Sequence, residues 1–125
     1  MTISEALRKG RKIAEENGIK HGKHMILYYD PEKPEDCMAC ALGEILIGVV
    51  GFEKAVKSDD SPYARVVELF PELSSKDKSP CIISQIEPQG KFKVDSELKS
   101  AIMWANDCRS LETEELAEIL EKCDL

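Results

Sequence analysis

The sequence predicts a mainly α-helical protein, with five or six helices packed around one buried central helix. Apolar residues recur at helical spacing in several segments. Several of these segments begin with a side chain that can cap a helix, or with proline at the first helical position. Residues 36–52 carry only one charge after Asp36, at Glu44, and a helix that is apolar on nearly all sides belongs in a protein interior.

The first helix is expected over residues 2–17. Thr2 and Glu5 fit a capping box, and Gly18 is well placed to end the helix. Basic and acidic residues occupy the face opposite the apolar stripe. The expected inner face consists of Ile3, Ala6, Leu7, Gly10, Ile13 and Ala14.

A short β-ribbon is the only sheet that the pattern suggests. Residues 25–29 form an apolar run, and residues 91–94 alternate between polar and apolar like a strand. The two segments could pair. Residues 30–36 between the first segment and the central helix should be a loop, because Pro31 and Pro34 interrupt them.

The central helix is expected to run from Asp36, its N-cap, to about residue 52. At about 1.5 Å per residue it reaches only about 24 Å, short of the roughly 30 Å hydrocarbon core of a bilayer. We therefore expect no membrane insertion. Its small residues would let neighbouring helices approach closely, and the helix could serve either a single-domain core or a homodimer.

Shorter helices should follow in the second half. Two of them begin with Ser-Pro, and the first should end at Pro71. In the last two helices, the inner face of the first would be formed by Leu98, Ala101 and Ile102, and that of the second by Leu116 and Leu120. The expected caps are Ser61, Ser79, Asp95 and, for the last helix, Ser110 or Thr113.

Length and charge limit the function classes. The 125 residues suit one domain over 1–125. The net charge is −7, and residues 1–24 carry +3, so residues 25–125 carry −10. An acidic body is a poor binder of nucleic acid and can instead dock on a basic protein surface. Without an apolar leader segment at the N-terminus, we expect a cytoplasmic protein whose five cysteines are reduced thiols.

The cysteines offer the main chemical alternative. Cys37 and Cys40 form C-x-x-C at the start of the expected central helix, where the helix dipole would favour a thiolate. This is typical of thiol–disulfide exchange, although the acidic neighbours of Cys37 would disfavour it. Zinc binding is the other possibility, with His21 or His24 able to replace one thiolate. The candidate metal ligands are Cys37, Cys40, Cys81 and Cys108.

Other sites have less support. No hydrolase motif or phosphate-binding glycine loop occurs, and nothing in the sequence brings Glu44 and Asp107 together as a carboxylate pair. Asn106 and Asp107 should end one helix and hydrogen-bond the turn to the next. The last helix presents a possible acidic docking face for a basic partner, formed by Glu114, Glu118 and Glu121.

Two short motifs resemble those of an uncharacterised family of small bacterial and phage proteins. Cys40-Ala41-Leu42-Gly43 is similar to the start of that family's C-A-L-G-A motif. Trp104-Ala105-Asn106-Asp107, followed by a capped final helix, is similar to its second landmark. Glu44 stands where the family motif has its second alanine. The resemblance implies a small, mostly helical domain of phage or mobile-element origin with no established activity, and it transfers no catalytic residue.

Taken together, the residues favour a non-enzymatic interaction or accessory protein without a cofactor. The alternative is a metal-binding or thiol-redox protein built on Cys37 and Cys40. Within the fold, we expect Trp104 and the final helix to pack on residues 40–43, because Ala41 and Gly43 are small enough to admit a bulky neighbour. Gly43→Leu should then destabilise the protein by overpacking, by about 1–3 kcal/mol.

Overall fold

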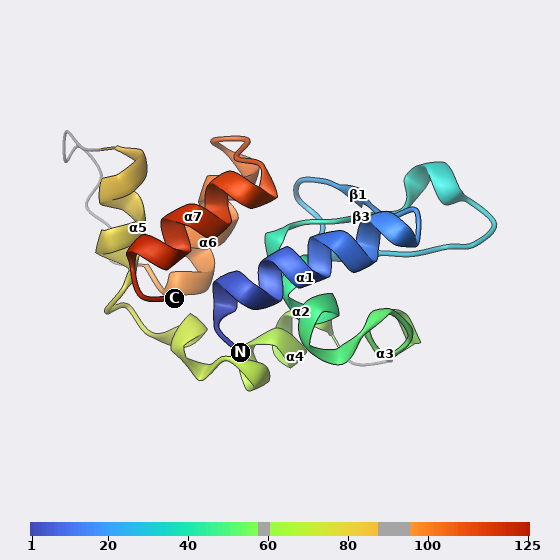
Figure 1. Cartoon of the computed structure of the whole chain (residues 1–125), viewed down its shortest axis with the longest axis horizontal. Coiled ribbons are helices and arrows are strands. Elements are labelled where there is room, and N and C mark those ends of the chain that lie inside the picture. Colours follow the sequence, from blue (N-terminus) through green and yellow to red (C-terminus); the bar gives the residue numbers. More distant parts are fainter. Residues whose placement is uncertain (58–60, 88–95) are drawn as a thin grey trace.

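Helices form most of the protein in the computed structural model, which describes residues 1–57, 61–87 and 96–125 (Figure 1). Within these residues there are seven α-helices and a three-stranded sheet, so the predicted mainly α class is confirmed. The elements, in order, are α1 (Ile3–Glu16), β1 (Lys20–His21), β2 (Leu27–Tyr28), η1 (Pro34–Asp36), β3 (Met38–Ala39), α2 (Ala41–Val50), α3 (Phe52–Lys57), α4 (Pro62–Leu69), η2 (Pro71–Ser74), α5 (Ser79–Ile86), α6 (Leu98–Asp107) and α7 (Thr113–Lys122).

Helices α1 and α2 cross in direct backbone contact (Figure 1). A Cβ atom on Gly10 would lie 1.6 Å from the carbonyl oxygen of Glu44, and one on Gly48 would lie 1.9 Å from that of Ala6. Only glycine allows this approach. The crossing explains why the predicted inner face of α1 is buried at Ile3, Leu7 and Ala14, together with Ala6 and Gly10.

The central helix is buried as predicted, but it is shorter than predicted. Helix α2 begins at Ala41 with Cys40 as N-cap and ends at Gly51, whose φ is +87°. Asp36 lies in η1 and caps nothing, because residues 38–39 are extended and pair in the sheet. Eight of the ten residues of α2 are buried within this one chain, so its apolar character needs no second copy.

The sheet is built differently from the expected ribbon. Strand β3 lies in the middle, parallel to β1 and antiparallel to β2. The segment around Leu27 and Tyr28 is therefore extended as expected, but its partner is Met38–Ala39. Residues 91–94, the expected partner, lie outside the described residues.

Most of the later helices begin near the predicted positions, but several of their N-cap residues differ from the predicted ones. Helix α4 begins at Pro62 after Ser61 and α5 includes Ser79-Pro80 at its start, as predicted. Helix α7 is capped by Glu112, in a capping box with Glu115, and not by Ser110 or Thr113. The N-caps of α5 and α6 are Lys78 and Glu97, and Asp95 lies outside the described residues.

A disulfide joins Cys81 of α5 to Cys123 at the end of α7. The expectation that all five cysteines are thiols is therefore wrong. The packing of α5 beside α7 holds the two Cα atoms 5.9 Å apart, although the residues are 42 positions apart in the sequence. Cys37, Cys40 and Cys108 are free.

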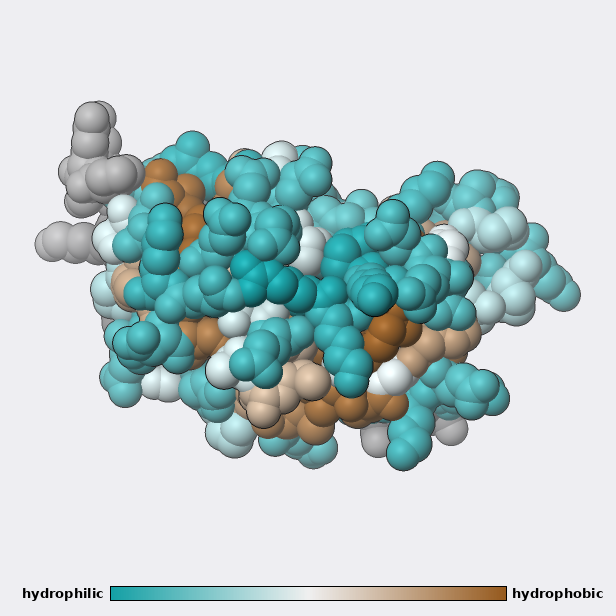
Figure 2. Space-filling model, viewed as in Figure 1, coloured by the Kyte–Doolittle hydropathy of each residue, from teal (hydrophilic) through white to brown (hydrophobic). Residues whose placement is uncertain are grey.

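One face of the molecule, viewed as in Figure 1, is mostly hydrophilic (Figure 2). Apolar atoms appear in separate areas, beside α5 and along the edge formed by α3 and α4. Among the described residues, the large apolar side chains that are exposed are Met1, Met25, Val49 and Leu69. Among the helices of the described residues, none has both the length and the apolar character that a membrane span requires.

Candidate functional site

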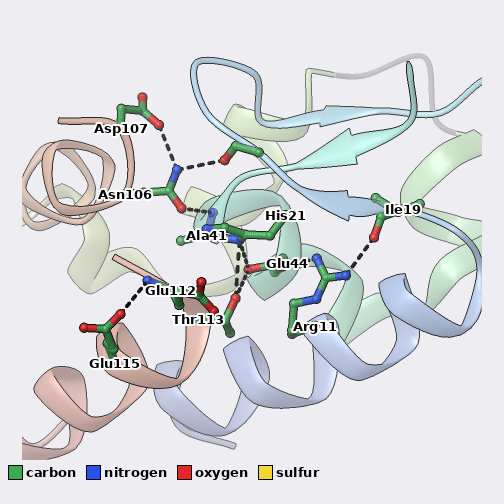
Figure 3. A network of polar contacts seen from close by, with 11 residues as sticks. Arg11, Ile19, His21, Ala41, Glu44, Asn106, Asp107, Glu112, Thr113 and Glu115 are labelled. Atoms are coloured by element: carbon green, nitrogen blue, oxygen red, sulfur yellow. Dashed lines mark hydrogen bonds and ion pairs between the residues drawn. The ribbon is translucent and has the colours of Figure 1, made fainter. Parts of the chain in front are cut away.

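Polar side chains are rare in the interior, and most of those present gather in one region. The buried polar side chains of the described residues are Ser4, Glu44, Ser79, Asn106 and Thr113. Three of these lie where α2 meets the β1–β2 loop, α6 and α7 (Figure 3). Since buried polar groups are costly unless they are paired, this concentration marks the region as the candidate site.

The carboxylate of Glu44 is the centre of this region, and its side chain has no solvent exposure. Its Oε2 accepts a hydrogen bond from Arg11 at 2.9 Å, while Oε1 accepts one from the hydroxyl of Thr113 at 2.8 Å. His21 Nδ1 lies 3.0 Å from the same Oε1. We call Arg11, His21, Glu44 and Thr113 the Glu44 cluster. It joins α1, β1, α2 and α7 through one buried charge.

The backbone explains why these residues meet. Gly10 and Gly48 set the crossing of α1 and α2, and Arg11 and Glu44 lie beside this contact. Gly18, with φ of +73°, then turns the chain from α1 into β1, which carries His21. Thr113 is the first residue of α7. A second hydrogen bond, from Arg11 to the carbonyl of Ile19 at 2.8 Å, ties α1 to the segment before β1.

The Glu44 cluster favours the charged form of His21. The hydrogen bond to Glu44 raises the pKa of His21 above its usual 6.5, against the opposing effect of burial. The Coulombic attraction of Glu44 and a hydrogen bond to the backbone of Leu111 raise the pKa further, while Arg11 lowers it. Glu44 and the backbone of Leu111 thus both favour the protonated imidazole over the neutral one.

A pocket of about 420 Å³ adjoins the Glu44 cluster. Its carboxylates have other roles: that of Glu112 caps α7, and that of Glu114 pairs with Arg8. The polar atoms of Arg11 and Thr113 are directed at Glu44. Apart from the carboxylate of Glu15, the pocket therefore presents groups that already have partners within the chain. It is lined by Arg11, Glu15, His21, Glu112, Thr113 and Glu114.

Asn106 forms a second buried junction, on the other side of the start of α2 (Figure 3). Its Oδ1 accepts a hydrogen bond from the backbone N–H of Ala41 at 3.1 Å, and its Nδ2 donates to the carbonyl of Gly22 at 2.9 Å. Nδ2 also donates to Asp107 Oδ1, which in turn accepts from the backbone N–H of His24 at 3.1 Å. The two residues do end α6 as predicted, but they bond to α2 and the β1–β2 loop.

The surroundings of Gly43 explain why a small residue is needed at this position of the C-A-L-G segment. A Cβ on Gly43 would lie 1.8 Å from the carbonyl oxygen of Ile26 and 3.2 Å from the Cβ of Ala39. The small residue at 43 therefore admits the backbone that precedes β2. Trp104 is half-buried and stacks with the guanidinium of Arg109, whose centre lies 5.3 Å from the ring.

The two cysteines of the C-x-x-C sequence are both buried. Burial raises the pKa of the Cys40 thiol. Cys37 precedes α2 by four positions, so it does not stand at the helix N-terminus. Its sulfur accepts a hydrogen bond from the N–H of Asp30 at 3.3 Å and donates to the carbonyl of the same residue.

The predicted metal ligands do not assemble into a site. Cys81 is bonded to Cys123 and cannot supply a thiolate, while Cys108 is exposed at the end of α6. His21 faces Glu44, and the exposed His24 lies near Asp107, with 3.6 Å between Nδ1 and Oδ2. Within residues 1–57, 61–87 and 96–125 there is no group of three or more such side chains that could hold a metal ion.

The acidic face of α7 is partly neutralised by α1. Arg8 pairs with Glu114, with 2.8 Å between Nη2 and Oε1, and also with Glu121. The hydrogen bond to Arg8 lowers the pKa of Glu114. Of the three predicted docking residues, Glu118 remains exposed without an ion pair to any residue that the structure describes.

Sequence reasoning missed the Glu44 cluster and the role of Asn106. One signal for Glu44 was present, since it is the only charge in an apolar helix, and a charge there requires partners. Searches against protein-family models, curated proteins and solved structures found no match to this chain. The assignment of a function therefore depends on this geometry.

Proposed function

We propose that the protein is a non-enzymatic interaction domain that binds a basic segment of a partner protein. The observation that carries the proposal is the state of Glu44. Its two carboxylate oxygens are engaged by Arg11, His21 and Thr113, all from the same chain. The strongest candidate for chemistry is thus occupied in holding four elements together, which supports a structural role for it.

The cysteine alternative receives less support. A thiol used in exchange needs a lowered pKa and access to solvent, whereas the pKa of Cys40 is raised by burial. Cys37 is engaged by the backbone of Asp30. About one zinc or iron per chain in protein purified without chelator, lost on changing both residues to serine, would overturn the proposal in favour of this alternative.

Charge supports a basic partner and argues against nucleic acid. The chain carries 24 acidic and 17 basic residues, and a nucleic acid would be repelled by the excess of carboxylates. A protein segment rich in lysine or arginine would be attracted, and complementary charge speeds and orients such an encounter.

The test is a selection of random 12-residue peptides displayed on phage against the immobilised, folded protein. We expect enrichment of peptides with several Lys or Arg residues and binding that weakens as the salt concentration rises, because screening acts on exposed charges. Enrichment of acidic peptides, or no enrichment at all, would overturn the proposal.

We also propose a cytoplasmic location, for which the three free cysteines are the support. In that compartment the bond between Cys81 and Cys123 would be exposed to reducing thiols. Trapping thiols with an alkylating reagent before cells are opened tests this location. Alkylation of Cys81 and Cys123 in addition to the three free cysteines would mean that their bond is reduced in the cell and would support this location, whereas a protected pair indicates an oxidising compartment.

A further inference from the structure

Two hollows meet at Tyr28, on the β2 and β3 side of the molecule. The first, of about 300 Å³, is lined by Met25, Tyr28, Asp36 and Met38. The second, of about 210 Å³, is lined by Leu27, Tyr28, Tyr29, Ala55, Val56 and Pro62. We propose that these hollows are the docking surface for the partner segment, which carries a lysine or arginine next to a large apolar side chain. This inference rests on the proposed function and names its surface.

The walls of the first hollow suit an apolar anchor. Met25 is 46% exposed, and the other exposed large apolar side chains among the described residues are Met1, Val49 and Leu69. The side chains of Met25 and Met38 are flexible and polarizable, so they can adjust to an inserted side chain. A partner that covers Met25 would remove from water one of the few large apolar side chains that the described residues expose.

The second hollow has a firmer wall. The rings of Tyr29 and Phe52 meet edge to face, with centroids 4.9 Å apart, a favourable arrangement for aromatic pairs. Ala55 of α3, which also lines this hollow, is buried. Tyr28 lines both hollows, so a bound segment that fills the first would lie next to the second.

The charge of the partner follows from the loop between β2 and β3. Residues 30–36 contain four carboxylates, at Asp30, Glu32, Glu35 and Asp36, and one lysine. The last three of these carboxylates are exposed, and Asp36 also lines the first hollow. No ion pair within the described residues engages any of the four. By contrast, Glu114 and Glu121 on α7 are paired with Arg8.

This loop is also held in shape before any partner binds. The Cys37 sulfur bonds to both the N–H and the carbonyl of Asp30, and Asp30 Oδ1 accepts from the N–H of Glu32 at 2.9 Å. Lys33 N–H donates to the carbonyl of Asp30 at 3.0 Å. A preformed loop loses less conformational entropy on binding. These bonds give the buried Cys37 a role that requires neither metal nor redox chemistry.

The experiment measures binding of the enriched basic peptides to three variants by fluorescence anisotropy. Met25→Ser removes the apolar side chain without adding charge, Asp36→Lys reverses a charge at the same hollow, and each should weaken binding at least tenfold. Glu118→Lys is the matched control on α7. It makes the same reversal of charge as Asp36→Lys and should change affinity less than twofold. Circular dichroism verifies that each variant is folded.

The outcomes separate the docking surface from the general function. Loss of binding in the Met25 and Asp36 variants with retention in the Glu118 variant supports the docking surface. Loss only with Glu118→Lys would overturn the docking surface and keep the interaction function, on α7. Equal peptide affinity of all three variants would also overturn the docking surface. Selection of no basic peptide overturns both proposals. Concentration-dependent dimerisation that is lost in Met25→Ser would instead assign the surface to a second copy.

Discussion

Replacing Glu44 by glutamine should destabilise the protein, and the loss should depend on pH. The substitution keeps the shape of the side chain but removes the charge that accepts from Arg11 at 2.9 Å and lies 3.0 Å from His21. Each charge-assisted hydrogen bond contributes about 1.5–3 kcal/mol. The buried carboxylate also costs desolvation energy, which the variant regains. We therefore expect a net loss of about 2–4 kcal/mol at pH 6.

The pH dependence comes from His21. Its pKa is raised in the folded protein by the hydrogen bond to Glu44, so protonation stabilises the fold. That contribution is complete below the unfolded pKa of about 6.5 and disappears as the pH rises through the higher folded value. A smaller fraction of the imidazole is protonated at pH 9 than at pH 6, while Arg11 stays charged at both values. The loss caused by Glu44→Gln should therefore be smaller at pH 9 than at pH 6.

Urea denaturation followed by circular dichroism, at pH 6 and pH 9, measures this difference. His21→Gln is the matched background, in which the loss caused by Glu44→Gln should become the same at both pH values. Exposed Glu118→Gln should change the free energy of unfolding by less than about 0.5 kcal/mol. An equal loss at both pH values in the natural background, or a larger one at pH 9, would refute the role given to His21.

Three further perturbations have clear expectations. Gly10→Ala should cost about 1–3 kcal/mol or more, seen as a lower melting temperature, because its Cβ would lie 1.6 Å from a carbonyl oxygen of α2. Asn106→Ala should cost about 1–3 kcal/mol in urea denaturation, because it leaves the N–H of Ala41 and the carbonyl of Gly22 without their partner. Reducing the disulfide between Cys81 and Cys123, which spans 42 residues, should cost up to about 4 kcal/mol, measured by denaturation with and without reductant.

Local signals in the sequence predicted most helices because they act through neighbouring residues. Thr2 accepts from the N–H of Glu5 as its capping position predicts, and Pro62 stands at the start of α4. The predicted start of α2 was wrong because an apolar run is compatible with both a buried helix and a buried strand. Residues 38–39 became a strand through pairing with residues 20–21 and 27–28, which are contacts that no local pattern contains.

The partners of the buried polar groups could not be predicted for a similar reason. Glu44 bonds to residues 33, 23 and 69 positions away in the sequence, and Ala41 bonds to Asn106 across 65 positions. A single sequence shows that such groups need partners, but not which ones the topology supplies. The disulfide could not be predicted for the same reason, because α5 and α7 are neighbours only in the folded chain.

The small sheet connects the Glu44 cluster to the proposed docking surface. His21 pairs with Ala39 in β1 and β3, and Met38, the other residue of β3, lines the first hollow. A change at Glu44 would therefore disturb both the interior and the surface, so loss of peptide binding in that variant would not identify the surface. Met25 and Asp36 are exposed and lie outside the Glu44 cluster, so their substitution tests docking without removing the buried charge that holds α1, β1, α2 and α7 together.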